Sequence, residues 1–181
     1  MDVAVFIDNS NVFKSIRKVR AVDHQWESFY NPHKLALNLT GNRNLVYVGF
    51  YCVHPPVSLL SEDAEHKKKH ILTEQYYSSV EKLPLTQVKY GQLHGKPGSY
   101  VEKNLDTQIC ADIITMAAMG EFDVAILVSN DGDFVSAVEN IKKFGRKVEV
   151  VFFKDGFSMD LRKSCDITRV ARRSHFERLI F

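Results

Sequence analysis

The chain has 181 residues, 45% of them hydrophobic, and its 24 basic and 22 acidic residues leave a formal net charge of +2. This length and apolar content suit one α/β domain spanning residues 1–181 with a full core. The near balance of charge excludes a surface that is basic throughout, so any nucleic-acid contact is expected to be local.

The cysteines and the apolar runs indicate the cellular compartment in which the protein is expected. The chain has three cysteines, an odd and widely spaced set that favours small core residues over a disulfide framework or a zinc site. The apolar run before Asp8 is too short for a signal peptide, and no stretch approaches the ~20 apolar residues of a membrane span. We therefore expect a soluble, cytoplasmic protein that does not enter a membrane.

The first predicted strand covers residues 3–7 and ends on the carboxylate of Asp8. Apolar residues at helical spacing follow it, which predicts a strand, a polar turn and a helix. A short turn of this kind places Asp8 at the carboxyl edge of a sheet. Residues 20–30 have no sustained period and are expected to form a loop. Its aromatic rings, Trp26 among them, either pin the loop to the core or stack on bases of a nucleic acid.

The next predicted elements are a helix bounded by Asn31-Pro32 and Gly41, a strand at 45–53 and a long polar helix at 58–82. The middle of the long helix carries the strongest local basic cluster of the chain, Lys67, Lys68 and Lys69. These lysines are interpreted either as a solvated face or as contacts for phosphate groups.

A strand-like run at 84–93 and a basic loop at 94–99 lead into an apolar helix predicted at 107–119. Asp106 lies at the start of this helix, where it could serve as a cap. Asp112 lies in its middle, and a carboxylate in so apolar a helix needs a partner or a role.

The segment 124–134 is the one on which the interpretation depends most. Five consecutive apolar residues predict a short strand buried on both faces, as in parallel sheets, and they stop at a tight turn, Ser129-Asn130-Asp131-Gly132-Asp133. Ligands bind at the carboxyl ends of such strands, so this turn is a candidate metal or catalytic site. The plainer alternative is that Asp131 or Asp133 merely caps the following helix.

The rest of the chain predicts a helix that Gly145 ends and a strand at 148–153. From Asp155 onward we expect helical or irregular covering segments, marked by Leu161, Ile167, Val170, Phe176 and Leu179. A basic surface is expected near the end of the chain from Arg169, Arg172 and Arg173.

Alternating strands and helices predict a three-layer α/β/α fold with a mainly parallel central sheet. If the first strand is central, Asp8 lies beside the strand that ends at Ser129, and three carboxylates meet at one edge. Clustered carboxylates persist only with raised pKa values or a bound cation, and ligands that are all oxygen favour Mg²⁺ or Mn²⁺. Hydrolysis of phosphodiesters is the leading reaction class for such a site.

Three motifs carry a family resemblance: Phe6 to Asn11, Lys103-Asn104-Leu105-Asp106 followed by Asp112, and Ser129 to Phe134. Together they resemble the NYN family of PIN-like nucleases, in particular its bacterial LabA-like branch. The resemblance implies a PIN-like α/β/α sandwich, a divalent-metal site and ribonuclease activity.

By this match the acidic metal-binding positions are Asp8, Asp106, Asp131 and Asp133. Asn11 matches the polar residue after the first strand, and Asp112 a further acidic position of the helix motif. Two departures are Asn104 and Asn130, where the family often has glycine. We expect the substrate to contact Ser129, Asn130 and Lys103 together with the three lysines of the predicted long helix, and Lys96 to flank the site.

The leading hypothesis is a Mg²⁺- or Mn²⁺-dependent ribonuclease with RNA as its partner and a homodimer as an open alternative. The second is a domain of the same fold that binds RNA or a protein without cutting. The third is an aspartyl-phosphate phosphotransferase with Asp8 as the nucleophile. Against the third, Ser10 stands where such phosphatases carry their second carboxylate.

Overall fold

The computed structural model describes residues 1–20, 29–61, 63–96, 99–154, 156–171 and 179. Its central sheet has six strands, all parallel, in the order β3-β2-β1-β6-β7-β8. The strands are β1 (Asp2–Asp8), β2 (Asn44–Cys52), β3 (Thr86–Tyr90), β6 (Val124–Val128), β7 (Lys147–Phe153) and β8 (Ile167–Ala171). The strand order changes direction between β1 and β6, so the carboxyl ends of these two strands form the switch point where open α/β sheets bind ligands.

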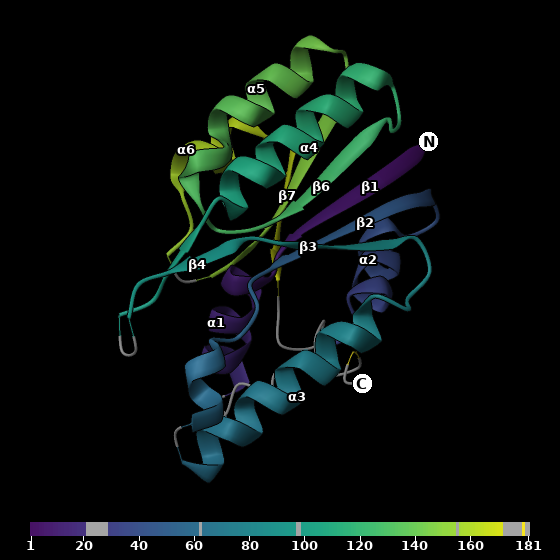
Figure 1. Cartoon of the computed structure of the whole chain (residues 1–181). Coiled ribbons are helices and arrows are strands. Elements are labelled where there is room, and N and C mark those ends of the chain that lie inside the picture. The colour runs from purple at the N-terminus through teal and green to yellow at the C-terminus, as the bar shows by residue number, and fades with distance from the viewer. Residues whose placement is uncertain (21–28, 62, 97–98, 155, 172–178, 180–181) are drawn as a thin grey trace.

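Helices cover both faces of the sheet (Figure 1). One layer holds α1 (Asn9–Arg20), α2 (Pro32–Thr40) and α3 (Ala64–Val80), and the other holds α4 (Leu105–Met119), α5 (Val135–Lys143) and α6 (Met159–Ser164). The predicted three-layer α/β/α architecture with a parallel sheet is confirmed. Among the helices of the described residues, none has both the length and the apolar character that a bilayer crossing requires.

Two short strands lie outside the main sheet. They are β4 (Gln92–His94) and β5 (Val101–Lys103), which pair in antiparallel fashion and lead directly into α4. Two single-turn 3₁₀ helices, η2 (Val57–Ser61) and η3 (Gly132–Phe134), precede α3 and α5. The hairpin and η3 therefore stand next to the two elements that carry the predicted carboxylates.

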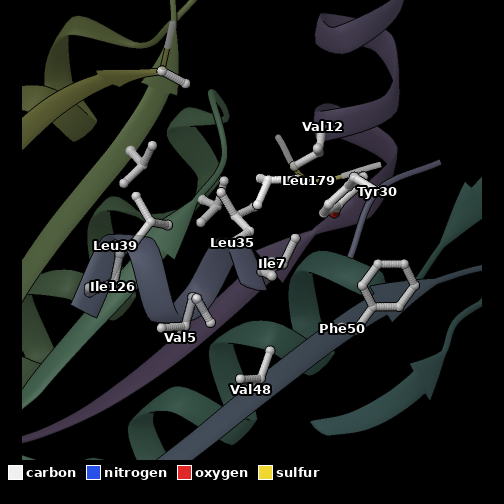
Figure 2. Close-up of a cluster of buried hydrophobic side chains, with 14 of the residues drawn as sticks. Val5, Ile7, Val12, Tyr30, Leu35, Leu39, Val48, Phe50, Ile126 and Leu179 are labelled. Carbon is white, nitrogen blue, oxygen red and sulfur yellow. The ribbon is translucent and has the colours of Figure 1, made fainter. Parts of the chain in front are cut away.

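The alternation of side chains along β1 decides which layer each residue faces. Val3, Val5 and Ile7 pack with α1, α2 and α3, whereas Ala4 and Phe6 pack with α4 and α5. Figure 2 shows Val5 and Ile7 in the first of these cores, beside Leu35, Val48 and Ile126. The same alternation points Asp8 toward the α4–α5 layer, which is where the second and third sequence motifs lie.

Two predicted elements need correction. The long helix expected at 58–82 is instead η2 followed by α3, because Asp63 caps α3 by accepting hydrogen bonds from the backbone N–H groups of Glu65 and His66. Residues 167–171, expected to be helical or irregular covering structure, form β8, which extends the sheet beside β7. Its exposed Ile167 and Val170 are three residues apart, which imitates a helical period. Trp26, Phe176, Arg172 and Arg173 lie outside the described residues.

An ion-pair triad joins β7 and β8 to the loop before β2. Glu149 on β7 is only 2% exposed, and its two carboxylate oxygens accept hydrogen bonds from the guanidinium groups of Arg43 and Arg169. Both arginines also donate to the backbone carbonyl of Leu39 at the end of α2. Arg169, expected to be part of a basic surface, is therefore engaged in holding the edge of the sheet.

We predict that Glu149→Ala lowers the free energy of unfolding by about 3 kcal/mol, because it leaves the guanidinium groups of Arg43 and Arg169 without their buried counter-ion. Glu139→Ala, which removes an exposed glutamate from α5, should change it by less than about 0.5 kcal/mol. Urea unfolding at neutral pH measures both. Equal effects of the two substitutions would show that the triad contributes nothing to stability.

Candidate metal centre

Asp8, the last residue of β1, is held by three hydrogen bonds. It accepts them from the backbone N–H of Asn11 at 3.2 Å, the side-chain amide of Asn11 at 2.9 Å and the hydroxyl of Ser129 at 2.9 Å. Asp8 is 4% exposed, so these donors replace the water that its carboxylate loses. Because Asn11 belongs to the first turn of α1 and Ser129 follows β6, the bonds join both sides of the switch point.

The turn after β6 is fixed from two directions. The hydroxyl of Ser129 also accepts a hydrogen bond from the backbone N–H of Asp131 at 3.1 Å. The side chain of Asn130 accepts from the backbone N–H of Phe153 at 2.7 Å and donates to the carbonyl of the same residue at 3.3 Å. Asn130 therefore ties the turn to the end of β7, a role that glycine could not fill.

The start of η3 fixes the positions of both Asp131 and Asp133. The carboxylate of Asp131 accepts a hydrogen bond from the backbone N–H of Asp133 at 3.1 Å and so caps η3. The plainer expectation, that an aspartate of this turn acts as a cap, is thus correct for Asp131. The cap occupies only one carboxylate oxygen, so it does not exclude a second role.

Asp106 is placed by an unusual backbone conformation just before α4. Asn104 has a φ of 70° and a ψ of 0°, in the left-handed region, which turns the chain from β5 into the helix. Asparagine enters this region more readily than other residues with a β-carbon, and glycine enters it freely. Asn104 thus provides the backbone geometry that glycine provides in the motif it resembles.

The three carboxylates of Asp106, Asp131 and Asp133 come together at the carboxyl edge of the sheet. Each offers an oxygen, and these oxygens all lie within 4.8 Å of one another. Burial, followed by the charges of Asp8, Asp131 and Asp133, raises the pKa of Asp106 to about 6. Mutual repulsion of this kind is what a bound cation relieves, and a donor set made only of oxygen suits Mg²⁺ or Mn²⁺.

Not every carboxylate from the motifs joins this cluster. Asp8 lies beside it, linked through Ser129, and is close enough to raise the pKa of Asp106. Asp112 instead accepts a hydrogen bond from the hydroxyl of Tyr51 at 2.8 Å, and its carboxylate lies 3.8 Å from the amino group of Lys89. The partners that a carboxylate in this apolar helix requires are thus Tyr51 on β2 and Lys89 on β3.

The lysines predicted to contact the substrate lie in different surroundings in the structure. Lys69 lines a cavity of about 500 Å³ beside the end of β1, whereas Lys67 and Lys68 are exposed and do not line it. Lys103, on β5, and Lys96 are also exposed. The structure thus brings only Lys69 of the three-lysine run into a concave surface next to the carboxylates.

Other lysines near the carboxylates were not identified as site residues from the sequence. A second cavity, of about 250 Å³, is lined by Asn11, Asn130, Lys14, Lys18 and Lys154. Lys14 also lines the larger cavity, so it stands between the two. The available signal was that Lys14 and Lys18 lie one turn apart on the polar side of the helix that follows Asp8.

Comparisons with known proteins show the family of the chain and support its fold. The NYN domain family matches the chain over residues 2–171. Among solved structures, the crystal structure of a protein of unknown function from Vibrio parahaemolyticus is similar with a TM-score of 0.64 and 22% identity, covering 97% of this chain and 94% of that one. At that identity the likeness shows the fold alone. The comparison with curated proteins gives no match.

The raised pKa of Asp106 predicts a pH-dependent effect of Asp106→Asn. Because the folded protein binds this proton more tightly than the unfolded chain, stability from this group falls as the pH rises from about 4 to about 6. In EDTA at about pH 8, Asp106→Asn should therefore raise the unfolding temperature by a few degrees, and near pH 4.5 the gain should be much smaller. Thermal unfolding followed by circular dichroism measures it. Glu139→Gln is the control, and a gain that is the same at both pH values would contradict this electrostatic account.

A second prediction concerns the backbone at Asn104. Asn104→Gly should keep or slightly increase the free energy of unfolding, whereas Asn104→Ala should lower it by about 1 kcal/mol because alanine is strained at positive φ. Chemical denaturation of both variants measures the difference. If alanine is as stable as glycine at this position, the left-handed conformation is not required.

Proposed function

This chain belongs to the NYN domain family, and from that premise we propose that it is a divalent-metal-dependent ribonuclease of the PIN-like type, in the LabA-like branch of the family. The observation that carries the proposal is the convergence of Asp106, Asp131 and Asp133 beside Asp8 at the switch point of the sheet. Three separate elements supply these residues, and burial together with the neighbouring charges raises the pKa of Asp106. Repulsion among clustered carboxylates lowers the stability of the folded protein, so such clusters are expected mainly at functional sites.

The residues present fit a hard divalent cation. Asp106, Asp131 and Asp133 would hold Mg²⁺ or Mn²⁺, and Asp8 keeps a free lone pair because a carboxylate has about four and three are used. When bound, such an ion polarises a phosphodiester and lowers the pKa of the attacking water. Asn11 and Ser129 fix the orientation of Asp8, which contributes negative charge to the site.

The two basic cavities that meet at Lys14 support RNA as the substrate. Lys14, Lys18 and Lys154 line the smaller cavity, and Lys14 and Lys69 line the larger one. Positive charge beside a negative metal site allows a phosphate backbone to approach without facing carboxylates alone. We place Ser129 and Asn130 near this path through the turn that they form.

The same basic cavities favour one second candidate, a domain that binds RNA without cutting it. Their lysines do not depend on a metal, so they could hold a strand even if the carboxylates were inert. The third hypothesis, an aspartyl-phosphate intermediate, is disfavoured, because Asp8 is buried and both of its carboxylate oxygens accept hydrogen bonds. A nucleophile needs an exposed oxygen with room for in-line attack.

The variant that tests the proposal is Asp131→Asn. It keeps the shape and the hydrogen bond that caps η3 while removing one charge from the proposed ligand set. Cleavage of a mixed-sequence RNA in Mn²⁺ or Mg²⁺ should fall by at least ~100-fold, since the ion contributes several kcal/mol to the transition state. RNA affinity in EDTA should hardly change, because a like charge is removed.

Glu139→Gln is the matched control, because it also neutralises one carboxylate but on the exposed side of α5. It should cleave as the parent does. A parent protein that cuts equally well in EDTA, or an Asp131→Asn protein that cuts as fast as the parent, would refute the metal-dependent mechanism. A parent that binds RNA and never cuts it would support the binding domain instead.

A further inference from the structure

The larger of the two cavities adjoins the carboxylates without including them. Its wall begins with Asn9 and Ser10, the two residues that follow Asp8, and extends between α1, α3 and the β4–β5 hairpin. Glu102 on the hairpin also lines it, and the charge of Glu102 contributes to the raised pKa of Asp106. The cavity therefore meets the acidic cluster from two sides, at the start of α1 and at the hairpin.

The polar part of the cavity wall is mainly basic. It contains one carboxylate, Glu102, against three permanent cations and two histidines, which are Lys14, Arg17, Lys69, His54 and His66. Lys14 and Lys69 come from different helices, and in the part of the chain that the structure describes neither forms an ion pair. Two such ammonium groups facing one hollow favour an anion within it.

The remaining wall is apolar and aromatic. Its residues come from the same helices, from the segment that follows β2 and from the β4–β5 hairpin, and they include Phe13, Pro55, Leu59, Tyr77, Leu93 and Tyr100. Phe13 and Tyr77 are held in the core by neighbouring rings, so this part of the wall is rigid. The hydroxyl of Tyr100 shares a hydrogen bond with Ser58 at 3.0 Å, which fixes the hairpin against η2. The cavity thus offers a preformed surface for a flat, apolar group beside cations.

We propose that this cavity is a subsite for one nucleotide of single-stranded RNA, next to the phosphate that lies at the acidic cluster, an inference that rests on the proposed function. Lys14 and Lys69 contact the phosphate of this nucleotide, and its base and ribose lie against the apolar wall. The volume of about 500 Å³ is within the range of pockets that enclose ligands of this size. A half-enclosed cavity admits an unpaired base but not a stacked base pair, so the substrate is single-stranded here.

The proposed subsite gives the three consecutive lysines of α3 different roles. Lys69 acts in the cavity, and the exposed Lys67 and Lys68 remain outside it. The test is the affinity of the full chain for a fluorescently labelled single-stranded RNA of about eight nucleotides, measured by anisotropy in EDTA so that cleavage plays no part. Lys69→Met should weaken binding about 5-fold and reduce the slope of log affinity against log salt by about one, as expected for one phosphate contact.

Two further variants make the result specific. Lys82→Met removes an exposed charge just past the end of α3 and away from the cavity, so it should change affinity by less than about 2-fold. Leu93→Trp adds an indole to the wall without altering charge, and it should weaken binding about 5-fold or more with no change in the salt slope. Circular dichroism and unfolding temperatures confirm that each variant is folded.

The outcomes separate this inference from the proposed function. If the parent binds the RNA and folded Lys69→Met and Leu93→Trp proteins bind it equally tightly, the subsite is wrong, while metal-dependent cleavage by the parent would still support the nuclease. If the parent never cleaves but loses affinity in both variants, the subsite stands and the nuclease proposal fails. If the parent binds no RNA in EDTA, the subsite is overturned.

Discussion

The pairing of β1 with β6 is the constraint on which the rest of the site depends. These two parallel strands are the neighbours in the described sheet that lie farthest apart in sequence, and they run in register from Val3 and Val124 to Ile7 and Val128. The next residue on each strand is then Asp8 or Ser129, and the hydrogen bond between them closes the switch point. The side chain of Asn11 donates a hydrogen bond to Asp8, and the backbone N–H of Asp131 donates one to Ser129. These bonds fix the start of α1 and the turn before η3 relative to the two strands.

The carboxylates assembled on this frame oppose folding, and the scaffold supplies the compensation. Asp8 loses its water but gains three hydrogen-bond donors, whereas burial and the neighbouring carboxylates raise the pKa of Asp106 to about 6. The two environments therefore divide the acidic residues into one that hydrogen bonds from the scaffold hold in place and a group whose repulsion a cation would relieve. Three lysines of the flanking cavities, Lys14, Lys18 and Lys69, lie on α1 and α3, in the opposite helix layer from α4, and a fourth, Lys154, follows β7. Among the described residues none of the four forms an ion pair with the acidic cluster, so positive charge borders the cluster without neutralising it.

Much of this could be predicted from the sequence, because the main signals are local. Continuous apolar strands that end on Asp8 and at Ser129 gave the parallel sheet and its switch point, and the capping signals at Asn31 gave α2. The cavity lysines of α1, Lys14 and Lys18, could not be singled out in this way, since a solvated helix face does not show which of its side chains border a cavity. Asp112 had no local partner, and Tyr51 and Lys89 reach it only through the sheet. β8 was missed because its pairing with β7 is decided by the backbone and by Glu149, whereas its own apolar spacing imitates a helix.

The central claim is that Asp106, Asp131 and Asp133 form a divalent-cation site next to Asp8. Anomalous diffraction from crystals of the full chain soaked in Mn²⁺ measures this most directly, since it locates the ion independently of any activity. The account predicts a manganese peak bounded by these three carboxylates at the carboxyl edge of β1 and β6. A well-diffracting soaked crystal with no peak there, or with manganese bound only at other acidic residues, would contradict it.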